Sequence, residues 1–216
     1  MTERATTGAR PDWWGPLLDR LASARVEDFS RLVVPAEGGR PSAVLVLFAD
    51  DRPEGPDVLL LQRAADMRTH AGQPAFPGGA ADPGDADVVA TALREATEEV
   101  GLDPGSVEIQ GTLPSLWIPV SNFIVTAVLA WWRTPHPVAA VDPREVELVA
   151  RVPIAHLADP ANRLRVRHRS GLVGPAFRTE NMVVWGFTAG ILSKLLDLGG
   201  WSRPWDTRSR PVDLPR

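Results

Sequence analysis

Short runs of consecutive apolar residues predict most of the strands in this chain. Ala43–Phe48 is rich in Val and Leu, and Pro41 and Asp50 bound it, as expected of a buried strand. Val58–Gln62 follows after a turn, so these two runs suit a hairpin with a long loop. Later runs predict the strands Val107–Leu113, Asn122–Trp132, Val146–Val152, Leu164–Arg169 and Val173–Phe177. The last two flank a Ser-Gly pair, which is a hairpin signal.

Apolar residues at helical spacing predict the helices. They recur three or four positions apart in Asp87–Val100, and Gly101 stands where a glycine commonly ends a helix. Val184–Leu198 has the same period. Its apolar stripe is expected in the core and consists of Trp185, Thr188, Ala189, Leu192, Leu195 and Leu196. A shorter helix is expected over Leu17–Ala24, opened by Pro16.

The order of these elements is strands, one central helix, more strands and a final helix, which is typical of an α+β fold. Arg63–Gly84 has little periodicity and is expected to be a long ordered loop, of the kind that often carries function. The chain divides into three predicted regions. Residues 1–30 form a tail and a short helix, residues 31–200 the main domain, and residues 201–216 a loose tail.

Composition excludes several classes of function. The 216 residues carry a net charge of −4, which argues against a nucleic-acid-binding protein. Cysteine is absent, so disulfides, thiolate metal sites and a cysteine nucleophile are excluded. No apolar run approaches the roughly 20 residues of a membrane span, and the first residues lead into no apolar segment, so no secretory signal is expected. We therefore expect a cytoplasmic protein with no membrane partner.

The central helix carries an unusual group of carboxylates. Glu95, Glu98 and Glu99 project from one face, because positions three and four apart are neighbours on a helix. Like charges at this spacing, near the negative end of the helix dipole, are unfavourable unless they are solvated or hold a cation. An exposed Glu-rich face alone is common. The flanking residues favour the cation, and clustered oxygen ligands suit Mg²⁺ or Mn²⁺.

The segment around these carboxylates resembles the Nudix box, G-x5-E-x7-R-E-U-x-E-E-x-G-U with U apolar. Every position from Arg94 to Leu102 fits. The first half departs from the pattern. Counted from Gly79, the acidic position falls on Asp85, and one additional residue separates Asp85 from Arg94.

The preceding segment, Leu59–Gly79, resembles the signature of the coenzyme A pyrophosphatase branch of the Nudix hydrolases, roughly L-L-T-x-R-[SA]-x3-R-x3-G-x3-F-P-G-G. That branch also tends to have Asp and the longer spacing in its box. Two positions differ from the branch: Leu61 replaces a usual Thr, and Ala80 stands where many members have Lys or Arg.

The resemblance implies a fold and a reaction. The fold is the Nudix fold, a mixed sheet sandwiched between helices (α/β/α), with residues 31–200 as the Nudix domain. In the reaction, water attacks a phosphorus of a nucleoside-linked diphosphate with Mg²⁺ or Mn²⁺ bound to the box. In this branch, coenzyme A or its thioesters yield 3′,5′-ADP and (acyl-)4′-phosphopantetheine. Dimers are frequent in the superfamily, so a homodimer is weakly favoured.

The resemblance also assigns roles to individual residues. The metal ligands would be Glu95, Glu98, Glu99 and the backbone carbonyl at Gly79. Arg94 would orient a carboxylate, and Asp82 and Asp85 are secondary candidates acting through water. The general base is either Glu98 or Glu145, although Glu145 can equally be an ordinary exposed acid. The candidate substrate contacts are Arg63, Arg68, His70 and Gly78.

Alternatives remain open at two levels. The substrate can be another diphosphate, such as ADP-ribose, a dinucleotide or a nucleoside triphosphate, and a ligand sensor without turnover is a further possibility. Separately, Arg163, Arg165, Arg167 and Arg169 alternate along a predicted strand. They suit an anion-binding strip, a dimer contact or a solvated face, and we favour the solvated face.

Overall fold

The computed structural model describes residues 11–30, 32–67, 70–168 and 171–213. Arg68, Arg169 and the first ten residues of the predicted N-terminal tail lie outside these ranges. The helices are α1 (Trp14–Ala22), α2 (Val26–Phe29), α3 (Val88–Val100), α4 (Ile154–Ala158) and α5 (Gly186–Gly199), with 3₁₀ turns at Pro104–Ser106 and Pro160–Asn162. The strands are β1 (Arg40–Ala49), β2 (Asp57–Arg63), β3 (Pro74–Ala75), β4 (Gly78–Ala80), β5 (Val107–Thr112), β6 (Leu116–Ile118), β7 (Phe123–Trp132), β8 (Val146–Pro153), β9 (Arg163–Arg167), β10 (Val173–Arg178), β11 (Val183–Val184) and β12 (Val212–Asp213).

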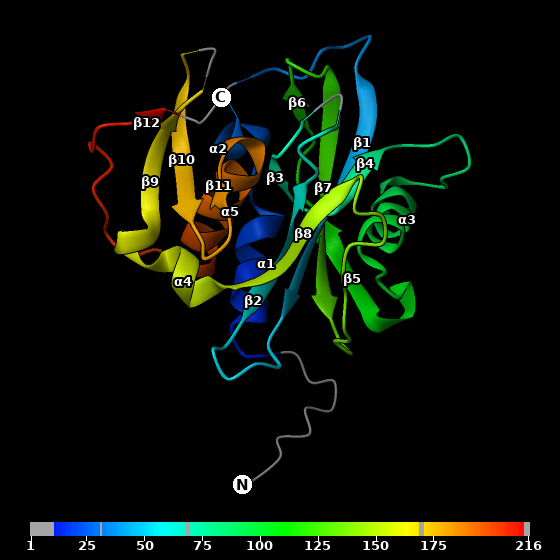
Figure 1. The fold of residues 1–216 in the computed structure, drawn as a ribbon, viewed down its shortest axis with the longest axis horizontal. Helices are drawn as coiled ribbons and strands as arrows, with labels where there is room; N and C mark the ends of the chain where they lie inside the picture. Colours follow the sequence, from blue (N-terminus) through cyan, green and yellow to red (C-terminus); the bar gives the residue numbers. More distant parts are fainter. Residues whose placement is uncertain (1–10, 31, 68–69, 169–170, 214–216) are drawn as a thin grey trace, which may run out of the picture.

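The larger sheet is mixed. Its central order is β3-β2-β1-β7-β5, with β4 paired to β1, β6 to β7 and β8 to β2. β1 and β7 run parallel from the Arg40–Phe123 pair to the Phe48–Trp131 pair, whereas the other pairings in this sheet are antiparallel. Figure 1 shows this sheet between α3 on one side and the smaller sheet on the other.

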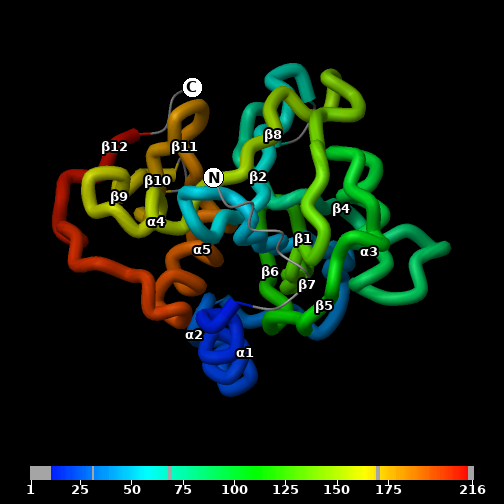
Figure 2. The backbone as a smooth tube through the Cα atoms, turned by 90° about the horizontal axis from the view of Figure 1, so that it is seen from below, coloured from blue at the N-terminus to red at the C-terminus, as the bar shows by residue number. Residues whose placement is uncertain are grey.

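Alternation along β1 builds two cores. Leu45 and Leu47 face α3, where they pack with Ala96. Val46 and Phe48 point to the opposite face, against α1 and α5. Helices thus cover both faces of the mixed sheet, which confirms the predicted α/β/α Nudix fold. The tube in Figure 2 shows the same layers from another direction, with α3 at the opposite end of the molecule from β9 and β12.

A smaller sheet of order β11-β10-β9-β12 packs beside α5. Its last strand corrects the prediction of a loose tail after residue 200, because β12 pairs in parallel with β9 at Val166. Trp201 also packs inward, with its ring 5.2 Å from that of Trp13 and 6.2 Å from that of Phe48. A strand of two residues is too short to have a readable period. The division of the chain into three regions stays a prediction.

Other boundaries also differ from the sequence predictions. The expected loop Arg63–Gly84 contains the short strands β3 and β4, which have no periodicity of their own. α1 begins at Trp14, before Pro16, because the N–H groups of a first helical turn have no intrahelical partner and proline loses nothing there. α5 begins at Gly186, so Trp185 precedes the helix and is only half-buried.

The solvated face expected for the alternating arginines is wrong for Arg163, whose side chain is 6% exposed. Its guanidinium lies between the rings of Phe177 and Trp205, at 4.6 and 4.7 Å, and donates to Ser193 Oγ at 2.9 Å. Arg167 is half-exposed, as expected of a solvated position. Arg163 is therefore a packing residue of the smaller sheet.

Within the residues that the structure describes, no helix is both long and apolar enough to cross a membrane.

Candidate active site

Helix α3 is capped at both ends. The Asp87 carboxylate accepts a hydrogen bond from Ala90 N at 2.8 Å and so caps the first turn. Gly101 ends the helix in the left-handed conformation, with φ of 70°. These signals confirm the predicted helix and its termination. They hold the carboxylate-bearing face of α3 beside β4.

The Gly-Gly pair of β4 permits an approach that no larger residue allows. A Cβ atom on Gly78 would lie 2.4 Å from the carbonyl oxygen of Ala43 in β1. A Cβ atom on Gly79 would lie 2.5 Å from the carboxyl group of Glu95. The Gly79 carbonyl accepts a hydrogen bond from Ser42 Oγ at 2.6 Å. The backbone of β4 therefore forms one wall of the site, directly against an acidic side chain of α3.

Arg94 connects the loop before α3 to the glutamates on the helix. Its Nε and Nη2 donate to the two oxygens of Asp85, both at 3.0 Å, and Nη2 also donates to the Ala80 carbonyl at 3.0 Å. Its Nη1 lies 3.1 Å from Glu95 Oε1 and 3.0 Å from Glu98 Oε2. The side-chain hydrogen bond from Arg94 holds the pKa of Asp85 well below its usual range. Asp85 thus serves to anchor Arg94.

Glu99 is the most buried of the acids, with a side chain 4% exposed. Its Oε2 accepts a hydrogen bond from Gly78 N at 2.8 Å, and its Oε1 accepts one from Arg63 Nη1 at 3.2 Å. Burial raises the pKa of Glu99 to about 7, against the opposing effects of these two donors. Its ionised form is therefore poorly stabilised by the protein alone, and an added cation would relieve that cost.

The other two glutamates are more open. The Glu95 side chain is 17% exposed, and burial also raises its pKa. Glu98 is 57% exposed, so it faces the solvent side of the site. The three acids form a graded set, from a buried carboxyl at Glu99 to a solvated one at Glu98. This gradient follows from the rotation of α3 against the sheet.

The residue types of the site suit a divalent cation, but their side chains are not arranged around a metal position. Among the described residues, no group of three or more acidic or histidine side chains is already arranged to hold a metal ion. Glu95 and Glu98 instead contact Arg94, and Glu99 contacts Arg63 and Gly78 N. Hard oxygen donors on one helix face, two of them with pKa values raised by burial, are nevertheless the donor set that Mg²⁺ or Mn²⁺ takes. The predicted ligand set stays a prediction.

The structure separates the predicted substrate contacts. Arg63 and Gly78 lie at the site through their contacts with Glu99. His70, with φ of 57°, has its Nδ1 2.9 Å from Gln73 Oε1, so it contacts its own loop. Arg68 lies outside the described residues.

The acids proposed as secondary ligands or as the base lie at the margins. Asp82 is 66% exposed, with its carboxylate 3.9 Å from Arg94 Nη1, and its N–H donates to Asp85. Glu145 is exposed, and its carbonyl accepts a hydrogen bond from Ala64 N at 2.9 Å. Its charge contributes to the raised pKa of Glu99. The loop before β8 thus brings Glu145 toward the same site.

Two hydroxyl groups at the site were missed by sequence reasoning. Ser42 Oγ donates to the Gly79 carbonyl at 2.6 Å, and Thr91 Oγ1 donates to Asp85 Oδ2 at 2.9 Å. Ser42 lies in an ordinary strand and belongs to no motif. Thr91 lies six residues after Asp85, and a hydroxyl at that place was the one available signal.

Comparisons with known proteins point to one family. The NUDIX domain family matches residues 39–172. Proteins described as "Uncharacterized Nudix hydrolase NudL" from Shigella boydii serotype 4 (strain Sb227) and Escherichia coli O1:K1 / APEC are 42% identical over 161 residues. These residues cover 72% of this chain and 81% of each relative. The crystal structure of a Nudix hydrolase from M. smegmatis, RenU, is similar in fold, with a TM-score of 0.53 and 20% identity over 76% of this chain and 88% of that one.

Proposed function

The chain belongs to the Nudix hydrolase family and is a pyrophosphohydrolase, and we propose that its substrate is coenzyme A or a coenzyme A thioester. Its products would be 3′,5′-ADP and (acyl-)4′-phosphopantetheine. Nudix hydrolases generally act on small diphosphates with divalent metal ions, and for this chain we propose Mg²⁺ or Mn²⁺.

One observation carries the choice of substrate. The upstream segment that resembles the coenzyme A branch runs through β2, β3 and β4, and it contacts Glu99 at two points. Arg63, its first arginine, donates to Glu99 Oε1, and Gly78, near its end, donates to Glu99 Oε2. The branch signature and the Nudix box therefore meet at one buried carboxyl. This contact supports a single site that both motifs serve.

The proposed metal ligands are Glu95, Glu98 and Glu99, with the carbonyl of Gly79. A divalent cation, when bound there, supplies charge neutralisation for the diphosphate and acidification of the attacking water. The chain's own contribution is to hold the acids in place. Arg94 does this for Glu95 and Glu98, because its guanidinium is itself fixed by hydrogen bonds to Asp85 and the Ala80 carbonyl.

The general base is proposed to be Glu98 or Glu145. Glu98 is solvent-facing and oriented by Arg94, so it can accept a proton from a water at the open side of α3. Glu145 is exposed on the loop before β8, close enough for its charge to act on Glu99. The pH–rate profile of Glu145→Gln distinguishes them, because Glu98→Gln is expected to lose turnover in either case. If Glu145 is the base, Glu145→Gln loses the acidic limb of kcat, whereas it keeps that limb if Glu98 is the base.

Arg63 is the described cation best placed for the substrate phosphates. Its Nη1 donates to Glu99, while its buried Nε donor has no hydrogen-bond partner among the described residues. A buried donor of this kind gains when an acceptor arrives, and a phosphate oxygen is a strong acceptor. Arg68 and His70 are proposed to border the same phosphates from the loop that follows.

Product analysis by chromatography tests the proposal. The protein is incubated with Mg²⁺ or Mn²⁺ and, separately, with coenzyme A, acetyl-coenzyme A, ADP-ribose, NADH and deoxynucleoside triphosphates, with Glu98→Gln as the control. We expect 3′,5′-ADP from coenzyme A at the highest rate, and its loss in the variant. A faster reaction with ADP-ribose or a nucleotide would refute the coenzyme A assignment. Absence of turnover with every substrate would favour a ligand sensor.

A further inference from the structure

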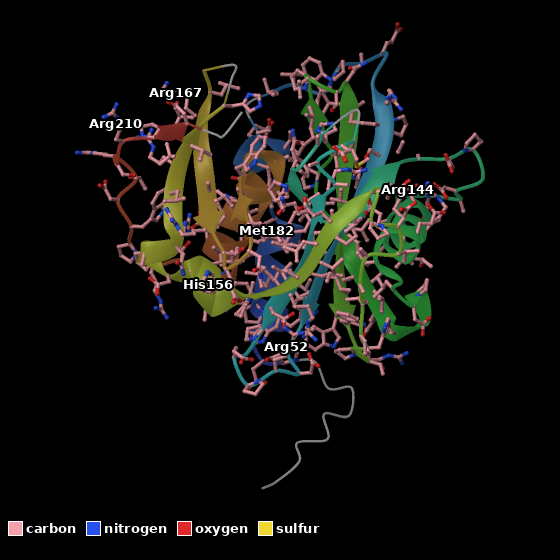
Figure 3. The ribbon with its side chains drawn as sticks, viewed as in Figure 1. Arg52, Arg144, His156, Arg167, Met182 and Arg210 are labelled. Carbon is pink, nitrogen blue, oxygen red and sulfur yellow. The ribbon has the colours of Figure 1, made fainter. Side chains whose placement is uncertain are left out.

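A cavity of about 590 Å³ lies between the larger sheet, at β2 and β3, and the smaller sheet. Gln62 and Pro74 line it from β2 and β3, whereas Val166, Met182 and Val212 line it from β9, the segment before β11, and β12. In Figure 3 Met182 lies between the smaller sheet and β8, and Arg144 lies beyond β8, toward α3. The volume of the cavity is typical of a small-molecule binding site.

The cavity begins one residue from the active site. Arg63 reaches Glu99 on the α3 face of β2. Gln62 precedes it in the same strand, so its side chain points to the opposite face, where it lines the cavity. β2 is not an edge strand, because β8 pairs with it along Asp57–Arg63 and β3 pairs with it at Leu61 and Gln62. The two faces of the sheet therefore meet beyond Arg63, the last residue of β2, and the arm of a substrate whose diphosphate lies at Arg63 would reach the cavity around that end of the strand.

The lining combines an apolar surface with unused amide groups. Leu164, Val166, Met182, Val183 and Val212 provide the apolar surface, and the valines on β11 and β12 are 39% and 52% exposed. Exposed valines in a concave site gain from an apolar occupant. The side-chain amides of Gln62 and Asn181 make no hydrogen bond with any other described residue. Each can both donate to and accept from an occupant that carries amides.

We propose that this cavity binds the pantetheine arm of the substrate, with the acyl group of a thioester against the exposed valines. The inference rests on the proposed function. The arm is uncharged beyond its phosphate and contains two amides, one hydroxyl and a terminal thiol or thioester, with methyl and methylene groups between them. Gln62 and Asn181 can pair with its amides while the valines cover its methyl and methylene groups. The cavity thereby gives the enzyme a reason to prefer a coenzyme A derivative to a shorter diphosphate.

The charges of the cavity do not favour the nucleotide half as its occupant. Arg178 lines it together with two acids, Glu180 and Asp213, and the Asp213 carboxylate lies 3.8 Å from Arg167 Nε. The cavity therefore has no excess of positive charge that would select the 3′-phosphate, whereas an uncharged arm needs none. Trp185 also lines the cavity, but its ring is already paired with that of His168, at a centroid distance of 5.8 Å.

Filling the cavity from an exposed position tests the inference. Val183→Trp places an indole in the cavity from a side chain that is already 39% exposed, and Val33→Trp, at an 83% exposed valine that does not line it, is the matched control. We expect Val183→Trp to raise KM for coenzyme A and octanoyl-coenzyme A about ten-fold or more, with kcat nearly unchanged. Inhibition by 3′,5′-ADP, which has no pantetheine arm, should keep its Ki. Val33→Trp should leave all these constants unchanged.

A second variant removes a polar contact without changing the volume greatly. Asn181→Ala, at an exposed residue, should raise KM for coenzyme A about five-fold, the worth of one hydrogen bond. Unchanged KM values in both variants would overturn the cavity assignment while leaving the proposed function intact. A Ki for 3′,5′-ADP that rises in parallel with KM would assign the cavity to the nucleotide half instead. If the wild-type protein releases no 3′,5′-ADP from coenzyme A, the proposed function fails and the assignment with it.

Discussion

Replacing Glu99 with glutamine measures the cost of keeping a buried carboxyl in the site. Burial raises the pKa of Glu99 from an ordinary value of 4.5 to about 7 in the folded, metal-free protein. The folded state therefore holds this proton more tightly than the unfolded chain does. Below the pKa that this carboxyl has in the unfolded chain, it does not reduce the free energy of unfolding. The cost grows as the pH rises from that value to about 7. At ~1.4 kcal/mol per pKa unit the full cost above that pH is about 3 kcal/mol.

Glutamine is uncharged like the protonated carboxyl, so Glu99→Gln should avoid this cost, at the loss of one of the two hydrogen bonds that the carboxyl accepts from Gly78 N and Arg63 Nη1. In a metal chelator at pH 8 we expect its free energy of unfolding to exceed that of the wild type by about 2–3 kcal/mol. At pH 5 the gap should shrink to less than about 1 kcal/mol, because the wild-type carboxyl is then mostly protonated in the folded protein. Urea denaturation at both pH values measures the gap. The same variant should lose turnover.

Glu98→Gln is the matched control, because it changes an acid of the same helix face that is 57% exposed. Its effect on stability should stay within about 0.5 kcal/mol at either pH. The reasoning is refuted if Glu99→Gln is less stable than the wild type at pH 8. A gap of equal size at pH 5 and pH 8 would refute it as well, since burial of a charge would then not be its cause.

Three further substitutions test other parts of the structure. Arg94→Lys should lower kcat about 10–100-fold in steady-state assays, because lysine cannot donate two parallel hydrogen bonds to the Asp85 carboxylate. Gly79→Ala should abolish activity while circular dichroism stays native, since its methyl group would meet the Glu95 carboxyl, whereas Gly84→Ala, with open space around its Cβ, should be active. Arg163→Lys should cost about 1–2 kcal/mol in urea denaturation through its loss of stacking between two rings, and the half-exposed Arg167→Lys should cost almost nothing.

The parts of the fold that the sequence predicts are those with a clear apolar pattern. β1 and β7 were predicted from runs of consecutive apolar residues and α3 from apolar residues at helical spacing, each within a few residues of its ends. β3, β4 and β12 have two or three residues each, too few for any period. They exist because a neighbouring strand offers unpaired backbone groups at their place, and that information lies elsewhere in the chain.

Sequence spacing likewise predicts some features of the site and not others. Spacing alone places Glu95, Glu98 and Glu99 on one face of α3, but it does not tell which of them is buried. Glu99 is buried because the rotation of α3 turns it toward Gly78 and Arg63, the latter 36 positions earlier in the chain. The prediction of a solvated Arg163 is wrong for the same reason. The alternation of arginines along the chain cannot show that two aromatic rings from other segments cover one of these arginines.

We propose that the carboxylates of α3 hold the divalent cation on which hydrolysis depends. Titration with Mn²⁺, followed by the electron paramagnetic resonance signal of the free ion, tests it on the wild type and on Glu95→Gln and Glu98→Gln. We predict that the wild type binds Mn²⁺ and loses turnover in excess chelator, and that each variant binds the ion at least ten-fold more weakly with a matching loss of rate. Undiminished Mn²⁺ binding in both variants, or full turnover of the wild type in chelator, would contradict the claim.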